Sequence, residues 1–255
     1  MLRLHVHTRP LLTASMTLAM AACAVSAHAG PITVVNGGFE QTLTPGSSEF
    51  GSSFPSDQVT GWTASGFNLV FTPGTADTTG AVEQFGTLKL WGPGTGSANG
   101  LPATSPAGGN FLAMDGGFNP GPVSQMLNGL TPGTPTTVSF LFAGAQQSGL
   151  DGATTEQLEV SLGSQNLFTP VLSDPSHGFT GWQQENLTFT PTSSSELLSF
   201  LAIGSPSGLP PFSLLDGVTV NSATPAVPEP ATLALLGTGL SGLAGFGWFR
   251  RKRSA

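Results

Sequence analysis

Short segments in which apolar and polar residues alternate recur along most of the chain. Val138, Phe140 and Phe142 alternate with polar or smaller neighbours such as Ser139, and residues 157–162 repeat the same period of two. Successive side chains of a strand point to opposite faces of a sheet, so this period predicts strands with one buried face. Clusters of Gly, Pro, Ser and Asn separate these segments, and no long apolar pattern of period 3.6 lies between them. The pattern predicts an all-β sandwich in a single domain.

Four other segments carry more specific expectations. Residues 67–71 alternate around Asn68, which predicts another half-buried strand. Residues 197–203 are apolar on both faces, which predicts a central strand. Residues 41–57 and 92–109 have little periodicity and are rich in Gly, Ser and Pro, so we expect loops there, where binding sites are often placed.

The carboxyl-terminal end has a different pattern. An apolar run at residues 231–249 is preceded by Val227, Pro228, Glu229 and Pro230 and is followed at once by Arg250, Arg251, Lys252 and Arg253. Nineteen residues at about 1.5 Å each give a helix of roughly 28 Å, close to the ~30 Å hydrocarbon thickness of a bilayer. A basic cluster behind such a helix stops transfer and fixes that end in the cytoplasm. The sequence therefore predicts a membrane-spanning helix with a stop-transfer end.

The amino-terminal end predicts export. Arg3 and Arg9 precede the apolar residues 11–25, and Ala27-His28-Ala29 is a small-x-small cleavage site. We expect residues 1–29 to be a signal peptide. The alternative is a lipoprotein signal in which Cys23, the only cysteine, would be lipidated. Cleavage after Ala29 would leave a mature protein without disulfide or thiolate chemistry.

The charge of the exported body limits its partners. Between residues 30 and 226, Lys89 is the one Lys or Arg residue, against thirteen of the fourteen acids. Such a body has almost nothing with which to neutralise phosphates, which excludes nucleic acid as a partner. Anionic polysaccharides and lipids are disfavoured for the same reason unless divalent cations bridge the charges.

The order of a Pro-Glu-Pro signature, a spanning helix and an Arg-rich end resembles the PEP-CTERM sorting signal of Gram-negative bacteria. The resemblance implies an exosortase-type membrane protease as partner, with an inner-membrane-anchored precursor that then reaches the cell surface or the extracellular space. It divides the chain into a signal peptide (1–29), a β-sandwich domain (30–222) and a sorting signal (223–255). The alternative is an ordinary single-pass anchor.

A second resemblance lies in the body. Its motifs follow one another at residues 36–40, Gly61-Trp62, 109–116, 123–127, the turn 130–133, Gly181-Trp182 and 214–220. This order is similar to the galactose-binding-like jelly roll of several carbohydrate-binding module families. The resemblance covers roughly residues 34–221 and implies a jelly-roll β-sandwich.

Glu40 and Asp216 are the candidate metal ligands. In such a jelly roll they would lie on the first and last strands, which are neighbours, and the resemblance implies a structural Ca²⁺ there. In a regular last strand Asp216 would share the buried face of Val218 and Val220, where a carboxylate needs a partner and no Arg is present. The alternative is that Gly217 marks a bulge that turns Asp216 to solvent or onto backbone N–H groups.

Trp91 is the candidate for stacking on a sugar, since it lies where a strand enters the Gly/Pro-rich loop. The alternative is a Trp that covers the sheet edge. Trp62 and Trp182 are expected to be core residues. With His177 as the one histidine of the body, no cysteine and no Gly-x-Ser-x-Gly motif, we expect no catalysis. The sequence favours a non-catalytic structural or adhesive surface protein; the alternatives are a module that binds a neutral polysaccharide and an extracellular hydrolase with a pair of acids.

Overall fold

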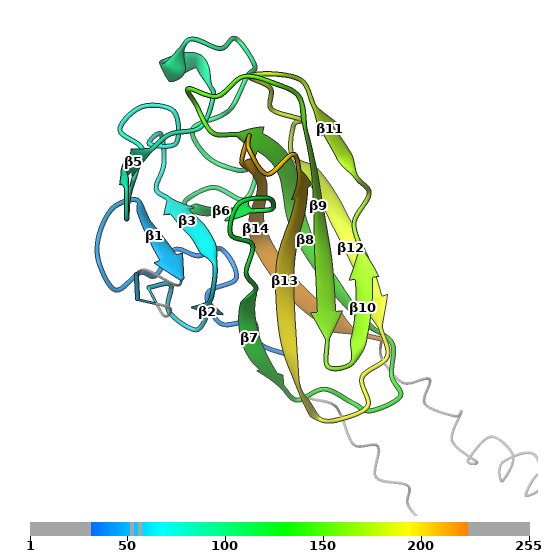
Figure 1. Ribbon diagram of the computed structural model, residues 1–255. Helices are drawn as coiled ribbons and strands as arrows, with labels where there is room; N and C mark the ends of the chain where they lie inside the picture. The colour runs from blue at the N-terminus through cyan, green and yellow to red at the C-terminus, as the bar shows by residue number, and fades with distance from the viewer. Residues whose placement is uncertain (1–31, 52–53, 56–57, 224–255) are drawn as a thin grey trace, which may run out of the picture.

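Two β-sheets pack face to face to form a sandwich (Figure 1). The computed structural model describes residues 32–51, 54–55 and 58–223. One sheet has the strand order β12-β8-β14-β6-β3-β1-β4-β5, and the other has the order β10-β9-β13-β7-β2 with β11 beside β9. The elements are β1 (Ser48–Gly51), β2 (Thr63–Ala64), β3 (Phe67–Phe71), β4 (Ala81–Glu83), β5 (Gly86–Leu88), η1 (Pro93–Thr95), β6 (Phe111–Asp115), β7 (Val123–Asn128), β8 (Thr136–Gln146), β9 (Thr154–Leu162), β10 (Gln165–Phe168), β11 (Leu172–Asp174), β12 (Gln183–Phe189), β13 (Ser195–Ser205) and β14 (Pro211–Ser222).

The predicted fold class is confirmed. The strands pair antiparallel apart from one contact between β1 and β4, and the short 3₁₀ turn η1 is the one helical element in the described part of the chain. The alternation predicted for β8 and β9 is also present: Val138, Phe140, Leu158 and Val160 are buried, and the residues between them are partly exposed. The body is a jelly-roll type β-sandwich.

Two apolar clusters lie on opposite faces of the eight-stranded sheet. In β6, Leu112 and Met114 belong to the cluster between the sheets, whereas Phe111 and Ala113 belong to the second cluster. In β3, Val70 belongs to the first cluster and Phe67, Leu69 and Phe71 to the second, and all five residues of the strand are buried. The prediction of a half-buried strand is therefore wrong for β3, because Ala76, Leu101, Phe179 and Trp182 from the connecting segments cover the outer face.

Strand β13 shows the opposite difference. It is central in its sheet, between β9 and β7, as predicted. Its inner face carries Leu198 and Phe200 in the main core, but Leu197 and Ile203 on the outer face are 45% and 39% exposed. Apolar residues on both faces therefore indicated the position of the strand in the sheet but not the burial of its second face.

The loops of the head lie at one end of the sandwich, and the described chain ends at the other. At one end Gln146 of β8 pairs with Pro211 of β14, and at the other end Thr136 pairs with Ser222. The eleven residues of β8 span roughly 35 Å between these ends at ~3.3 Å per residue. We call the end formed by residues 146–154, 174–178 and 205–211 the head. Strand β14 and the described residues end at this second end, opposite the head (Figure 1).

Candidate functional site

A groove of about 320 Å³ lies beside the head. Its walls come from the β4–β5 hairpin, from the segment around Phe118 and from two head loops that contribute Gln147, Leu150 and Pro210. Glu83 and Gln147 supply polar side chains, and no Lys or Arg lines the groove. An apolar groove with a few polar groups has the composition of a small-ligand or sugar site.

Two phenylalanines of this groove are unusually exposed. Phe85 in the β4–β5 turn is 74% exposed, and Phe118 is 58% exposed. The ring of Phe118 packs edge-on against Phe67, with centroids 6.5 Å apart. The turn around Phe85 is held by a 2.6 Å hydrogen bond from its backbone N–H to the carboxylate of Glu83. Exposed aromatic faces that line such a groove can stack on the apolar face of a sugar ring.

Neither phenylalanine was among the site residues predicted from the sequence. The available signal was a bulky apolar residue within a turn: Phe85 stands between Gln84 and Gly86, and Phe118 follows two glycines. Neither position belongs to a segment of alternating apolar and polar residues, so the pattern that predicts strands gives no signal for either residue.

Trp91 lies near this groove but does not line it. Its indole N–H donates a 2.9 Å hydrogen bond to the carbonyl oxygen of Leu150, and its ring lies against the imidazole of His177. The ring is half-buried, and His177 covers one face. The role of Trp91 in sugar stacking remains a prediction.

The other two tryptophans were expected to be core residues. Trp62 is buried between the sheets, and its indole N–H bonds to the carbonyl of Asn36. Trp182 is partly exposed and packs against Phe111 and Phe179 in the second cluster. The core prediction is therefore confirmed for Trp62, whereas Trp182 contributes to the outer cover.

The carboxylates of Glu40 and Asp216 both approach Gly38, and a metal ion shared by them remains a prediction. A Cβ atom built on Gly38 would lie 3.7 Å from Oε1 of Glu40 and 3.8 Å from Oδ1 of Asp216. Glu40 accepts a 3.0 Å hydrogen bond from the backbone N–H of Asn110. It lies before β1 and outside every strand, so its expected place on a first strand is wrong.

Asp216 is fully buried, but not for the reason that the sequence suggested. Strand β14 bulges after Asp216, where the pairing with β8 shifts and Gly217 takes a φ of +62°. The bulge reverses the alternation: Leu215 and Val218 both face the main core, so Asp216 lies on the opposite face, with Leu214. The bulge of the alternative is therefore present, and Asp216 accepts a hydrogen bond from the Gly217 N–H, but the side chain does not turn to solvent.

The hydrogen bonds and electrostatics of Asp216 suit an oxygen-seeking cation. Burial raises the pKa of Asp216 to about 6, and the nearby charge of Glu40 adds to the rise, whereas hydrogen bonds from the Ser105 hydroxyl and the Gly217 N–H lower it. Two carboxylates that form no salt bridge with any described residue supply the hard oxygen donors that Ca²⁺ prefers. The described residues contain no group of three or more His, Cys, Asp or Glu side chains that could hold a metal ion, so other ligands would be carbonyl, hydroxyl or water oxygens.

Several predicted features lie outside the described residues: the signal peptide with Cys23, the motif of Val227, Pro228, Glu229 and Pro230, the apolar run 231–249, and Arg250, Arg251, Lys252 and Arg253. Within the described ranges, no helix has the length and hydropathy needed to cross a bilayer. The spanning helix and the boundaries at residues 29 and 222 remain predictions.

Comparison with known proteins identifies the sorting signal. Residues 226–252 match the family model of the PEP-CTERM protein-sorting motif, which confirms this part of the sequence prediction. The motif implies a protein that is exported, anchored in the membrane and then processed. No curated protein matches the sequence.

The structural neighbours include carbohydrate-binding modules. TmCBM61 in complex with beta-1,4-galactotriose shares 14% identity over 76% of this chain and 100% of that chain, with a TM-score of 0.38. The CBM22-1 xylan-binding domain from Paenibacillus barcinonensis Xyn10C shares 12% identity over 79% of this chain and 100% of that chain, with a TM-score of 0.36. At these scores the neighbours say nothing about a ligand of this chain, and its function has to be argued from its own residues.

Proposed function

We propose that the protein is an exported, non-catalytic surface module that binds a neutral polysaccharide through the groove of Phe85 and Phe118. The observation that carries this proposal is the exposure of two aromatic rings, held by Glu83 and Phe67, in one groove with few polar groups. Leaving two large apolar rings in water costs hydrophobic free energy, which a stacked sugar would recover.

The location of the groove supports a binding role at a surface. It adjoins the head, whereas the chain continues toward the sorting motif from the opposite end, after Ser222. A protein attached through its carboxyl-terminal end would therefore present the groove away from the attachment point.

The charge of the chain selects the class of ligand. Lys89 is the one Lys or Arg residue between residues 30 and 226, and the groove itself contains Glu83. An anionic glycan would meet repulsion in this groove, whereas a neutral glycan would not. The proposal therefore concerns uncharged polysaccharides.

A structural Ca²⁺ at Glu40 and Asp216 forms part of the proposal. The two acids come from the segment before β1 and from β14, so a shared ion would join the beginning and the end of the domain. Ser105, whose hydroxyl donates to Asp216, would add the 105–110 loop to the same site. The ion would contribute stability rather than chemistry.

Binding to a panel of neutral polysaccharides, by affinity electrophoresis or a glycan array, tests the proposal. Phe85→Ala should weaken binding at least tenfold, which corresponds to about 1.4 kcal/mol. The matched control is Phe168→Ala, because Phe168 is 51% exposed on β10, outside the groove, and this variant should bind normally.

Two results would contradict the proposal. Equal binding by the Phe85→Ala variant would place the ligand elsewhere, and retention by no neutral polysaccharide would leave the structural or adhesive role that the sequence favoured. Release of reducing sugars from a bound polysaccharide would instead indicate a hydrolase.

A further inference from the structure

A second pair of acids lies inside the head, separate from Glu40 and Asp216. Glu156 is on β9, and Asp174 ends β11; the two strands pair so that Leu172 faces Glu156 and Asp174 faces Thr154. Residues two apart on one face of paired strands are diagonal neighbours, within reach of a carboxylate side chain. Both acids are only 1% exposed.

These carboxylates have unsatisfied oxygen atoms. Oε1 of Glu156 accepts a 2.5 Å hydrogen bond from the hydroxyl of Thr154. Among the described residues, Oε2 of Glu156 and both side-chain oxygens of Asp174 have no hydrogen-bond partner. Buried carboxylate oxygens without a donor are costly, so these three atoms indicate a missing positive group.

The surrounding side chains do not supply that group. Gln146 is the nearest amide, but its N–H₂ group donates to the Thr154 hydroxyl and to the carbonyls of Asp174 and Pro175. The imidazole of His177 faces Asp151 and Trp91. No salt bridge to either acid occurs in the described ranges.

Two glycines lie against the carboxylate oxygens of Glu156 and Asp174, where a larger side chain would clash. A Cβ atom on Gly144 of β8 would lie 2.6 Å from Oε2 of Glu156, and a Cβ atom on Gly178 would overlap Oδ1 of Asp174. Glycines therefore stand where the two carboxylates approach β8 and the 175–178 turn. The site is enclosed between the two sheets at the head.

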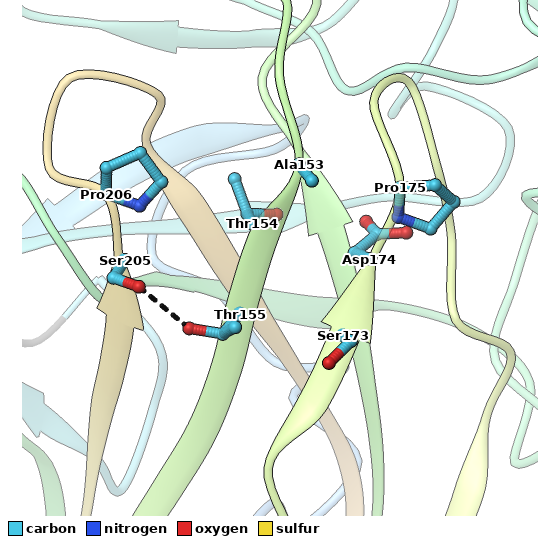
Figure 2. Close-up of a pocket in the computed structure, with 8 residues that line it drawn as sticks. All are labelled: Ala153, Thr154, Thr155, Ser173, Asp174, Pro175, Ser205 and Pro206. Carbon is cyan, nitrogen blue, oxygen red and sulfur yellow. Dashed lines mark hydrogen bonds between the residues drawn. The ribbon is translucent and has the colours of Figure 1, made fainter.

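The buried site borders the surface of the head. A hollow of about 420 Å³ on the head is lined by residues of β9, β11 and the end of β13, including Asp174. Figure 2 shows Asp174 between Thr154 and Pro175 at this hollow, while Thr155 bonds to Ser205 beside it. The site therefore lies next to this hollow, while the side-chain oxygens of Asp174 are themselves buried.

We infer that Glu156 and Asp174 bind one divalent cation, Ca²⁺, at a second site in the head. The four carboxylate oxygens and the Thr154 hydroxyl form an all-oxygen donor set, which suits Ca²⁺ rather than metals that prefer nitrogen or sulfur ligands. The ion would neutralise two buried charges and hold β11 to β9. It would thereby fix the segment after β11 that places His177 against Trp91.

Protonation of the pair is the competing state. Burial raises the pKa of Glu156 to about 8, with the charge of Asp174 adding to the rise, and raises the pKa of Asp174 to about 7. Without a cation, the pair would therefore hold protons near neutral pH. A test at a pH of about 8.5, above both values, favours the cation over the proton.

The experiment uses the full chain purified in mild detergent, carrying Asp216→Asn so that the site at Glu40 does not contribute. After chelation, equilibrium dialysis against about 1 mM Ca²⁺, a concentration suited to extracellular sites, should give one bound ion per chain. The melting temperature should rise by about 2–4 °C on adding the ion. Glu156→Gln in the same background should abolish both responses, and the control Glu159→Gln, on the outer face of β9, should keep both.

Absence of bound Ca²⁺ in the Asp216→Asn protein overturns the inference. So does an unchanged calcium response after Glu156→Gln. If the Glu156→Gln variant does not fold, Asp174→Asn replaces it. Dialysis of the Asp216→Asn protein, in which Glu156 and Asp174 are both unchanged, still decides whether an ion binds.

Discussion

The indole ring of Trp91 stacks on the imidazole of His177, with ring centroids 3.9 Å apart and an angle of 30° between the planes. Nε2 of His177 lies 2.5 Å from a carboxylate oxygen of Asp151, and the indole N–H of Trp91 bonds to Leu150. The segment after β5 therefore meets two segments of the head, after β8 and after β11, through two side chains. The stack holds together the loops that border the groove.

The first prediction concerns this stack. Trp91→Phe keeps an aromatic ring against His177 but removes the N–H that donates to the Leu150 carbonyl. We expect a loss of about 1 kcal/mol in the free energy of unfolding, the usual value of one hydrogen bond. Urea denaturation measures it.

The same variant separates the two roles of Trp91. If Trp91 only supports the loops, Trp91→Phe should leave polysaccharide affinity within about twofold, whereas loss of a sugar-stacking indole should cost tenfold or more. Unchanged stability would contradict the structural role derived from the hydrogen bond to Leu150.

The second prediction concerns calcium at Glu40 and Asp216. An ion that binds only the folded state stabilises it by about 2.7 kcal/mol at a hundredfold excess over its Kd. Chelation should therefore lower the melting temperature by several degrees, and Asp216→Asn should reduce the number of bound ions by one. Dialysis with metal analysis and a thermal melt measure the two effects.

The comparison with and without calcium is made within each variant, because replacing a buried acid also changes the stability of the metal-free protein. Glu159→Gln serves as the control and should keep the full response. An Asp216→Asn protein that binds as many ions as the unaltered chain would exclude Asp216 as a ligand.

How far the sequence could predict this site depended on one glycine. The sequence identified Glu40 and Asp216 as neighbours through the resemblance to a known fold, and in the structure both carboxylates approach Gly38. The sequence left the face that Asp216 occupies open between a regular strand and a bulge at Gly217, because alternation is reliable only where a strand is regular. The same limit applies to β3, whose burial depends on distant loops that cover its outer face.

The pairing of Glu156 with Asp174 in the head could not be predicted from the sequence for another reason. Glu156 occupies an inward position of β9, where its place among Leu158 and Val160 could be read from the alternation. Its partner Asp174 lies on a three-residue strand that pairs with β9 out of the main order of the sheet. Short strands carry too few residues for a period to be recognised.

The third prediction is a pH dependence of stability in the presence of chelator. In the folded state Glu156 has a raised pKa of about 8 and Asp174 one of about 7, and the pKa values of Asp216, Glu49 and Glu185 are also raised, in each case mainly by burial. The folded state therefore binds more protons than the unfolded state between the ordinary carboxyl pKa values and about pH 8. Stability should fall as the pH rises through this window.

Melting temperatures measured from about pH 5 to about pH 8.5 check the sign, and they should decrease by several degrees. Glu156→Gln should make the dependence shallower, because a neutral amide replaces an acid that loses its proton in this range. Glu159→Gln should leave the dependence unchanged. Stability that increases with pH would contradict the raised pKa values.

The fourth prediction concerns the sorting motif. From the sequence we expect Pro228 and Pro230 to keep the segment around Glu229 extended and accessible to a protease. In the native host, Glu229→Ala should leave an unprocessed or mislocalised precursor, which mass spectrometry of the carboxyl-terminal end would identify. Glu159→Gln, an acid within the sandwich, should be processed normally.

Processing should also remove the apolar run that follows the motif. If the surface form of the unaltered protein still contains Trp248 and Phe249, the chain is held by an ordinary membrane anchor and the sorting interpretation is wrong.

The pairing of β14 also determines how the domain responds to mechanical force. This strand leads out of the sandwich toward the sorting motif, and it is hydrogen-bonded to β8 on one side and to β6 on the other. A pull between a polymer held near the head and an attachment beyond Ser222 acts along the strand axis, whereas the ladder hydrogen bonds lie perpendicular to it. The load is then shared in shear by many bonds at once instead of peeling them apart one by one. If the domain binds a polymer as proposed, the direction in which the last strand runs would make it a strong link under tension.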